Sequence, residues 1–483
     1  MKEVKHIGDP VLTPSTEDWG GKGANLLELA QFNNVPPGFI VNADGYDEFV
    51  QQSEIQGLEW IDNDGDVDLD WIQTNRQRGD VTLSEIQDTT QEIFLNNQIP
   101  SNYEAEIDEA LQDYEPEFFT RSSAVNEDGE DNSGAGRLES FGPISNNGGV
   151  IASEEFLSGD IRYSNAKNGV FKGIKAVYST AFSETALNYL LDNDMESFGG
   201  VAVPVQEAID TASGGVIFSA HPNGDPQNVY MELCETPGDA VEDGERERIE
   251  VEMDRPESPR AEAEATEMDH KNKYPFESVS IISESQVEDL AEKAANIQST
   301  YDSPMDIEAA YDNEGNLWVL QGRPITVDGY DQPAFDMPGD IEPPTNETLA
   351  ETETVANHGI LEAPALVVRD TDPDGLYDTD PVDEQYRDVR NEIREYDSEF
   401  SDGYILVTNI MSNEIQNLTE NMEAIVGSDS GRSCHATTVA AEEGTMYMGA
   451  LETDIEESLE HGDPLYMAVN GHEGELYDGS DSL

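Results

Sequence analysis

The chain has 483 residues, and its 104 acidic and 24 basic side chains give a formal net charge of −80 at pH 7. A field of this sign excludes nucleic acid and anionic membranes as expected partners, because both are negatively charged themselves. Cys234 and Cys434 lie far apart and lack metal-ligand spacing, which excludes a disulfide framework and a zinc site. The length allows two or three domains, each with its own core.

Strong acidity does not predict disorder here. Apolar residues make up 36% of the chain, and they gather in runs such as 37–41, 216–218 and 404–407 that are typical of buried strands. A folded, acidic, lysine-poor protein fits a cytoplasm with molar salt, where the Debye length is about 3 Å and surface charges are screened. The N-terminus has no apolar segment typical of a secretion signal, and no stretch is apolar enough to span a membrane. We therefore expect a soluble, cytoplasmic protein from an extreme halophile.

Residues 1–330 alternate short apolar runs with amphipathic stretches, the pattern of a mixed α/β domain. The first helix is predicted after the turn Gly20–Gly23 (GGKG), because the apolar positions of residues 24–30 have helical spacing and two prolines follow at 36–37. Backbone N–H groups at such a helix start, beside the positive side chain of Lys22, could bind an anion.

A basic residue inside a small-residue turn is informative in a chain with few cations. Thr120–Ala124 (TRSSA) contains Arg121, and a small-residue loop follows at 132–136 (NSGAG). Backbone amides in such a loop can approach phosphate oxygens closely. Together with Lys22, these segments indicate a site for a polyphosphate.

A hairpin with acidic side chains on one strand is predicted around a short turn at 312–316. Because side chains alternate along a strand, Asp306 and Glu308 share one face of the first strand. Gln321 and Arg323 share a face of the second strand for the same reason. Two carboxylates suit Mg²⁺, and an arginine suits a phosphate.

The composition changes twice before the second domain begins. The charged segment 238–272 is predicted to be an exposed loop or hairpin, and 327–352 contains four prolines and several acids, which is typical of a linker. We therefore expect domains at residues 1–330 and 353–483, joined by a linker at 331–352.

The second domain is predicted to contain strands at 404–408 and 423–426, followed by a helix that starts near His435. The acidic stretch 370–402 is predicted to be an exposed helical insertion. A small-residue turn precedes His435, so its imidazole would lie half-exposed near backbone N–H donors that could hold a phosphoryl group.

Each of these motifs also has an ordinary structural interpretation. The GGKG turn can simply precede a helix, Asp306 and Glu308 can lie on a solvated face, and His435 can be a hydrogen-bonded structural histidine. Their order along one chain favours phosphate chemistry over these interpretations.

The same segments, in the same order, resemble a known family. Four segments resemble the nucleotide-binding domain of phosphoenolpyruvate synthase and pyruvate phosphate dikinase, namely Gly20–Phe49, Arg121–Phe141, Val201–Pro222 and Asp306–Thr326. Residues 404–449 resemble the phosphohistidine domain of that family. The resemblance implies an α/β (α+β) protein in which an ATP-grasp nucleotide-binding domain is followed by a swivelling β/β/α phosphohistidine domain.

The resemblance also implies the ligands, ATP and Mg²⁺, and the residues that hold them. The residues implied for the phosphates are Lys22, Arg121 and Arg323, with Gly134 and Gly136 in the covering loop. The implied Mg²⁺ ligands are Asp306, Glu308 and Gln321. Glu232 would bind the ribose, and Gln206 and Glu207 would lie along the adenine.

The activity implied is that of an ATP-dependent phosphotransferase. His435 would take the β-phosphoryl group of ATP, while Lys22, Arg121 and Arg323 would neutralise the charge that develops during transfer. The family's barrel, which binds phosphoenolpyruvate and pyruvate, has no counterpart in these 483 residues. The acceptor would therefore be pyruvate on a separate barrel subunit, or another small molecule.

An alternative is a nucleotide-binding or assembly protein that keeps the fold with impaired catalysis. The family's Gly-Leu-Gly-Glu segment is replaced by 236–239 (TPGD), and its Gly-Ile-Pro-Ala-Val run by 444–448 (GTMYM). The phosphohistidine motif also differs at Thr438 and Ala441. The presence of the basic residues and of His435 favours the enzyme.

Overall fold

The structure is a computed structural model. The residues that it describes are 3–11, 13–51, 58, 60–61, 67–114, 117–126, 128–129, 132–133, 138, 140–145, 166–192, 195, 197–221, 227–235, 248–256, 282–325, 348–352, 354–356, 358–368, 403–408, 422–427, 445–449, 451, 455, 458–470 and 474–479. Gly134, Gly136 and His435 lie outside the described residues, as do the helix predicted near His435 and the stretch 370–402.

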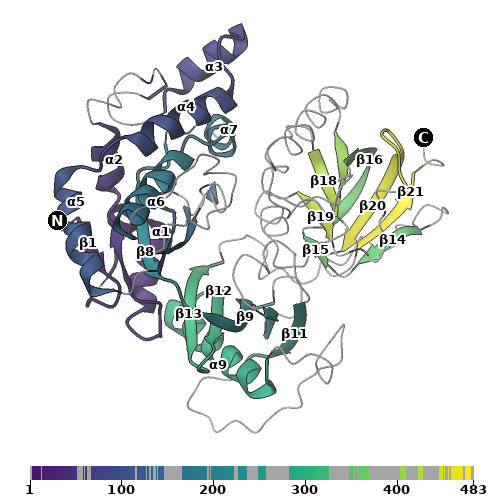
Figure 1. The fold of residues 1–483 in the computed structure, drawn as a ribbon. Coiled ribbons are helices and arrows are strands. Elements are labelled where there is room, and N and C mark those ends of the chain that lie inside the picture. The colour runs from purple at the N-terminus through teal and green to yellow at the C-terminus, as the bar shows by residue number, and fades with distance from the viewer. Residues whose placement is uncertain are drawn as a thin grey trace. The chain divides into compact units, whose positions relative to one another are not determined.

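The chain divides into two compact units (Figure 1). One comprises Met1–Asp210 with Leu317–Arg323, and the other Thr211–Asn316 with Pro324–Leu483. Helices and sheets occur together, which confirms the predicted α/β (α+β) class. The domain boundaries expected at residues 330 and 353 stay a prediction.

The first unit is built on an antiparallel sheet. Its strand order is β1 (Val4–His6), β2 (Gly38–Val41), β8 (Val201–Glu207), β3 (Glu117–Thr120) and β7 (Phe141–Ser145), with β4 (Ser123–Ala124) also beside β8. A separate pair of strands is β5 (Asp128–Gly129) and β6 (Asn132–Ser133). The helices are α1 (Thr16–Leu29), α2 (Asp44–Val50), α3 (Leu69–Arg78), α4 (Leu83–Asn96), α5 (Ser101–Ala110), α6 (Ala166–Thr180) and α7 (Glu184–Asp192), with a 3₁₀ turn at Leu111–Asp113.

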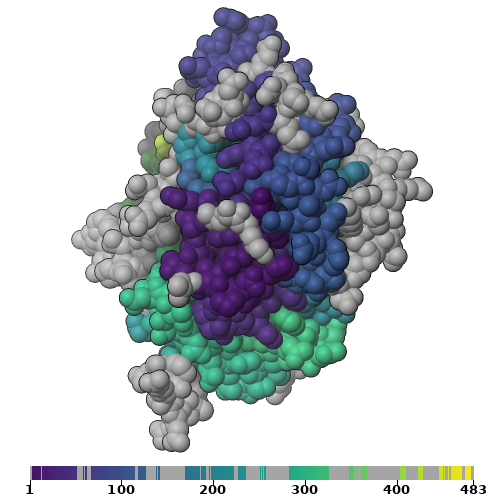
Figure 2. Space-filling view, turned by 90° about the vertical axis from the view of Figure 1, so that its left-hand side faces the viewer, coloured from purple at the N-terminus to yellow at the C-terminus, as the bar shows by residue number. Residues whose placement is uncertain are grey.

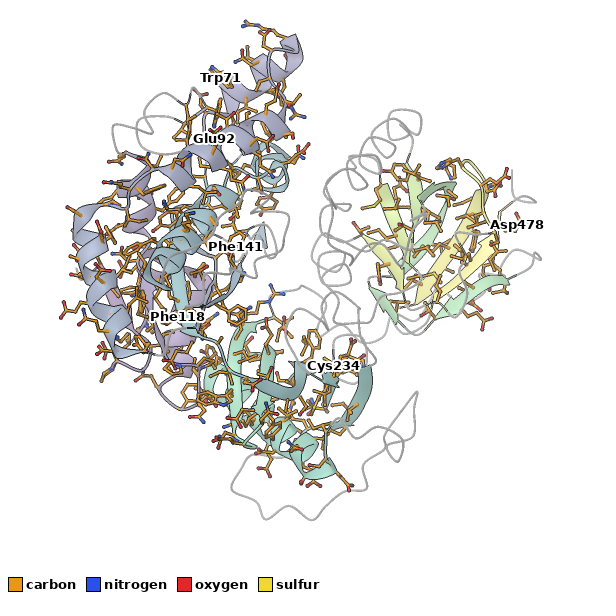
Figure 3. All side chains as sticks on the ribbon, in the orientation of Figure 1. Trp71, Glu92, Phe118, Phe141, Cys234 and Asp478 are labelled. Carbon is orange, nitrogen blue, oxygen red and sulfur yellow. The ribbon has the colours of Figure 1, made fainter. Side chains whose placement is uncertain are left out.

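Alternation along β8 explains how both faces of this sheet are buried. Val203 and Val205 lie in the large core, with side chains of α4 and α6 and with Phe118 and Phe141, which Figure 3 labels. Ala202, on the other face, lies in a smaller cluster with side chains of α1. Figure 2 shows one face of the molecule, where N-terminal residues are drawn in purple and blue.

The start of α1 differs from the sequence-based prediction. The helix begins at Thr16, so the GGKG turn lies inside it and not before it. Gly20, with φ 65° and ψ 174°, breaks the helix at this point. The strand predicted at 37–41 is confirmed as β2, which begins at Gly38.

The second unit contains an antiparallel run of four strands. Their order is β11 (Arg248–Asp254), β10 (Asn228–Glu235), β9 (Thr211–Phe218) and β12 (Met305–Asp312). The helix α9 (Glu284–Tyr301) packs on β12, β9 and β10, and its apolar side chains are buried. β11 lies within the segment 238–272, but it pairs with β10 outside that segment and its Val251 is buried, so residues 248–254 are a paired strand and not an exposed loop.

The turn predicted at 312–316 is confirmed. The main-chain N–H of Asp312 donates to the oxygen of Asn316 at 3.0 Å, and the Asp312 carboxylate accepts from the N–H groups of Glu314 and Asn316 at 2.9 and 2.8 Å. An aspartate that accepts from following N–H groups is a recurrent way to fix a tight turn. The predicted second strand, β13 (Leu317–Pro324), begins directly after it.

A second sheet of this unit holds the C-terminal region. Its order is β14 (Thr348–Thr352), β21 (Gly474–Asp478), β20 (Pro464–Asn470), β16 (His358–Val368), β17 (Tyr404–Thr408), β18 (Met422–Gly427), β19 (Met446–Gly449) and β15 (Thr354–Ala356). β16 to β19 run parallel, and the other pairs are antiparallel. The strands predicted at 404–408 and 423–426 are therefore confirmed as β17 and β18.

The strands at the two ends of this sheet are neighbours in the sequence, so the two ends meet at one corner. β14 ends at Thr352 and β15 begins at Thr354, yet they stand at opposite ends of the strand order. The Thr352 hydroxyl donates to the oxygen of Gly449 on β19 at 2.6 Å. Apolar side chains from strands throughout the sheet form one core inside it. No described helix is long and apolar enough to cross a membrane.

Candidate nucleotide-binding site

The two basic motifs of the first unit meet through one buried hydroxyl. Ser123, two residues after Arg121, is wholly buried, and its Oγ accepts from the main-chain N–H of Gly23 at 2.8 Å. The same Oγ donates to the main-chain oxygen of Trp19 at 2.9 Å. Segments about one hundred residues apart are thus joined, and the turn that carries Lys22 lies against the strand that follows Arg121.

The glycine at position 20 is required by this contact. Its φ of 65° lies in the region that side chains other than glycine rarely adopt. A Cβ at Gly20 would also overlap the main-chain oxygen and the Oγ of Ser123. The close approach of the two segments therefore depends on the absence of a side chain at this position.

Arg121 is fixed by its backbone and by an aromatic ring. Its N–H donates to the oxygen of Pro204 on β8 at 2.9 Å. Its guanidinium carbon lies 5.6 Å from the centre of the Phe119 ring, within the range of a cation–π interaction. The Nε atom is buried and has no hydrogen-bond partner among the described residues. A buried donor of this kind is costly unless a ligand satisfies it.

Gln206 presents a second unsatisfied group on the same sheet. The residue is only 2% exposed, and neither its Oε1 nor its Nε2 has a hydrogen-bond partner within the described part of the chain. Gln206 on β8 is the direct cross-strand partner of Phe119 on β3, so the two side chains share a face. That face therefore carries a guanidinium, an aromatic ring and a free amide, which can donate to and accept from a ligand.

Glu207 does not share this face. Successive side chains on a strand point to opposite faces, so its carboxylate lies on the side away from Gln206. Its main-chain N–H donates to the oxygen of Pro37 at 2.8 Å. A contact of Glu207 with the ligand of Gln206 would therefore be made by the backbone.

In the second unit, register places three predicted acidic residues on one face of the sheet. Glu308 pairs with Val216, which pairs in turn with Glu232, and Asp306 pairs with Phe218. Because direct partners across antiparallel strands share a face, Asp306, Glu308 and Glu232 point to the same side. Tyr311 alternates to the other side, where its hydroxyl contacts Asp289 of α9 at 2.7 Å. The acidic face is therefore opposite α9.

Glu232 is the only aspartate or glutamate that is buried among the described residues. The Tyr230 hydroxyl donates to its Oε1 at 2.8 Å. The ring of His221, itself buried, lies 4.8 Å from that of Tyr230 between centroids. Asp306 and Glu308 are half-buried. In the described part, three or more His, Cys, Asp or Glu side chains nowhere gather closely enough to form a metal site by themselves.

The other predicted residues are placed as follows. Gln321 and Arg323 lie on β13 and are half-buried. They are two positions apart on the strand, so their side chains share a face. β13 is fixed to the segment after α1 by a hydrogen bond from the Val319 N–H to the oxygen of Asn34 at 2.8 Å. The loop with Gly134 and Gly136 lies outside the described residues, as does His435.

Three residues of the site escape sequence reasoning. For Phe119 and Tyr230 the sequence predicts only that they lie on strands. Their contacts with Arg121 and Glu232 are seen only in the structure. Ser123 lies inside a motif that the sequence singles out, but the turn that it holds is about one hundred positions away. For Tyr230 a weak signal exists, because a tyrosine two positions from a glutamate on a strand shares its face.

Comparison with known proteins gives an independent result. Residues 16–337 match the family described as pyruvate phosphate dikinase, AMP/ATP-binding domain. A probable phosphoenolpyruvate synthase of Methanothermobacter thermautotrophicus is 25% identical, over 95% of this chain and 61% of the relative. Phosphoenolpyruvate synthase of Escherichia coli is 25% identical, over 88% of this chain and 51% of the relative. Phosphoenolpyruvate synthase of Pyrococcus furiosus is 24% identical, over 95% of this chain and 57% of the relative. The chain thus spans from 51% to 61% of the length of these relatives.

Proposed function

Because the chain belongs to the family of the pyruvate phosphate dikinase AMP/ATP-binding domain, with its ATP-grasp fold, we propose that it is an ATP-dependent phosphotransferase. The observation that carries the proposal is the pair of unsatisfied polar groups on one sheet face, the Gln206 amide and the Arg121 Nε. Both are buried, and both belong to motifs that the resemblance assigns to ATP. A nucleotide would satisfy the amide with its base and the guanidinium with its phosphates.

The phosphate chain of ATP would be held by cations in small-residue turns. Lys22 and Arg121 belong to segments that Ser123 joins, and this contact supports their joint action on the phosphates. Arg323 and the loop with Gly134 and Gly136 would complete the set. Cations placed in this way stabilise the charge that spreads over the phosphoryl oxygens during transfer.

The nucleoside would be bound by an amide and a carboxylate. The Gln206 amide can donate to and accept from the edge of adenine, and the backbone of Glu207 would continue along the base. Glu232 would accept hydrogen bonds from the ribose hydroxyls. Its burial and its bond from the Tyr230 hydroxyl support a fixed orientation of that carboxylate.

Mg²⁺ would be held by oxygen atoms of Asp306, Glu308 and Gln321. The donor set fits, because Mg²⁺ prefers a few carboxylate and carbonyl oxygens and keeps other positions for phosphate and water. The shared face of Asp306 and Glu308 supports their joint use. The ion would supply neutralisation of the phosphate charge.

The phosphoryl group would pass to His435, eight positions after the end of β18. A neutral imidazole nitrogen would attack the β-phosphorus, the bond to the oxygen bridging the α- and β-phosphates would break, and AMP would leave. Transfer of the γ-phosphoryl group to water would release orthophosphate, and its transfer to orthophosphate would release pyrophosphate. The phosphohistidine would then be passed to pyruvate on a separate subunit or to another small molecule.

The test is labelling with ATP that carries radioactive phosphorus at the β position, in molar KCl with Mg²⁺. We expect a protein-bound label that is lost in acid and stable in alkali, and that is absent from His435→Ala. The variant His472→Ala, which changes a histidine outside all motifs, should keep the label. A wild-type chain that binds ATP but takes up no label would contradict the transferase and favour the nucleotide-binding protein with impaired catalysis.

A further inference from the structure

We propose that Ser123 is a positioning residue for the nucleotide site, because its side chain sets the shape of the turn that presents Lys22. The inference rests on the proposed function, since it concerns how Lys22 and Arg121 come to act on one phosphate chain. It assigns to Ser123 no contact with the nucleotide itself.

The argument begins with the two main-chain atoms that Ser123 bonds. In a regular α-helix, the N–H of residue 23 donates to the oxygen of residue 19, four positions earlier. Here the N–H of Gly23 donates instead to Ser123 Oγ at 2.8 Å, and that hydroxyl donates to the oxygen of Trp19 at 2.9 Å. The hydroxyl has therefore inserted into one helical hydrogen bond, which is a recognised cause of a helix kink.

The insertion coincides with the break in the backbone. Gly20, the residue after Trp19, has φ 65° and ψ 174°, whereas the rest of α1 is helical. The opened turn spans Gly20 to Lys22, so Lys22 lies between the two main-chain groups that the hydroxyl bridges. The position of its side chain therefore depends on a contact from another part of the chain.

That contact also fixes where Arg121 stands relative to the turn. Ser123 is two residues after Arg121, and the strand pairing of both is set by β8, through Pro204 for Arg121 and Ala202 for Ser123. The turn is thus held against a rigid strand and not against a loop. Catalytic groups need such support to stay in a productive arrangement.

Removal of the hydroxyl has a specific expected consequence. In Ser123→Ala the N–H of Gly23 and the oxygen of Trp19 lose their shared partner, but they can bond to each other as in a regular helix. The turn would then close and carry Lys22 away from its present place. The protein should fold, while ATP binding should weaken about tenfold, the change that loss of one hydrogen-bonded contact produces.

Calorimetric titration of the full chain with ATP, in molar KCl with Mg²⁺, tests this. Ser179→Ala is the matched control, since Ser179 is also buried in the first unit and its hydroxyl donates to the Ala176 oxygen at 2.8 Å within α6. We expect unchanged ATP affinity in that control. Equal affinity of wild type and Ser123→Ala would overturn the inference and leave the proposed function intact, whereas a wild type that does not bind ATP would overturn both.

A double-mutant cycle separates positioning from general stability. If Ser123 acts through Lys22, the alanine substitution should weaken ATP binding about tenfold in the wild type and by less than twofold in Lys22→Gln. Independent effects that multiply in the double variant would overturn the inference. Should Ser123→Ala not fold, Ser123→Cys replaces the hydroxyl by a somewhat larger thiol that is a weaker hydrogen-bonding group. This variant should show the same coupling with Lys22→Gln at smaller amplitude.

Discussion

The guanidinium carbon of Arg121 lies 5.6 Å from the centre of the Phe119 ring, and Phe119 is itself the direct cross-strand partner of Gln206. An aromatic ring thus neighbours both Arg121 and Gln206, two residues with buried polar atoms that lack a hydrogen-bond partner among the described residues. The ring can hold the guanidinium by its negative face while leaving the Nε–H free for a ligand. Phe119 therefore belongs to the site without supplying a polar group to it.

The first prediction concerns this ring. Phe119→Leu should weaken ATP binding about two- to fivefold, because a half-exposed cation–π interaction contributes about 0.5–1 kcal/mol to holding the guanidinium in place. Phe119→Tyr keeps the ring and serves as the control, with affinity close to that of the wild type. Calorimetric titration with ATP measures both, and an unchanged affinity in the leucine variant would show that the ring does not orient Arg121.

Local patterns predicted the strands and turns that depend on nearby residues. The runs at 37–41, 404–408 and 423–426 are strands, and the turn at 312–316 is fixed by the side chain of Asp312, a residue within the turn. Each is determined by neighbouring residues, through apolar content or turn chemistry. Such features are accessible to sequence reasoning because they need no knowledge of distant contacts.

The start of α1 could not be predicted in this way. Its kink at Gly20 depends on the Ser123 hydroxyl, and no local sequence pattern predicts a hydrogen-bond partner about one hundred positions away. The sequence indicates the GGKG motif but does not indicate that it lies inside a helix. The same limit applies to Phe119 and Tyr230, because their contacts with Arg121 and Glu232 depend on the folded strands and have no local sequence pattern.

Gly20 should tolerate no side chain. Gly20→Ala would place a Cβ against the main-chain oxygen of Ser123, in a backbone conformation unfavourable to alanine. Gly79→Ala is the control, because Gly79 has a similar φ of 72° but nothing within 4 Å of its Cβ position. Urea denaturation in molar KCl should show a loss of about 1 kcal/mol for Gly79→Ala and a loss at least about 2 kcal/mol larger for Gly20→Ala. Similar losses in both would mean that the approach of Ser123 is not close.

Tyr230 should be needed for the orientation of Glu232. Tyr230→Phe removes the 2.8 Å hydrogen bond to a buried carboxylate, and hydrogen bonds to charged groups contribute about 1.5–3 kcal/mol. We expect the free energy of unfolding to fall by about that amount. We also expect ATP affinity to fall several-fold, because the Glu232 carboxylate, proposed to bind the ribose, would lose the hydrogen bond that orients it.

The control for this prediction is Tyr311→Phe. Tyr311 is also buried and its hydroxyl donates to Asp289 at 2.7 Å, but it lies on the α9 face of the sheet, away from Glu232. We expect lower stability with unchanged ATP affinity. Urea denaturation measures the stability of both variants, and calorimetric titration measures their ATP affinity. Equal ATP affinity in the two variants would contradict a role of Tyr230 in binding.

The last prediction concerns the buried Lys175 of α6. Its Nζ donates to the main-chain oxygens of Leu95 and Asn97, at the C-terminal end of α4, at 2.6 and 2.9 Å. Burial, with a smaller effect of the Lys172 charge, lowers the pKa of Lys175 from its ordinary value of 10.5 to about 8. A neutral amine still has two N–H groups for these two oxygens, so the contact survives loss of the proton.

The sign of the pH effect follows from the lowered pKa. Between about pH 8 and 10.5 the unfolded chain holds the proton on residue 175 more often than the folded chain does, so this group makes the protein more stable as pH rises through that window. Lys175→Met lacks the titrating group and is the reference. The free energy of unfolding of the wild type minus that of the variant, measured by urea denaturation at constant salt, should be flat below pH 8 and rise above it. A difference that stays constant up to pH 10.5 would mean that the ammonium group is not desolvated in the folded protein.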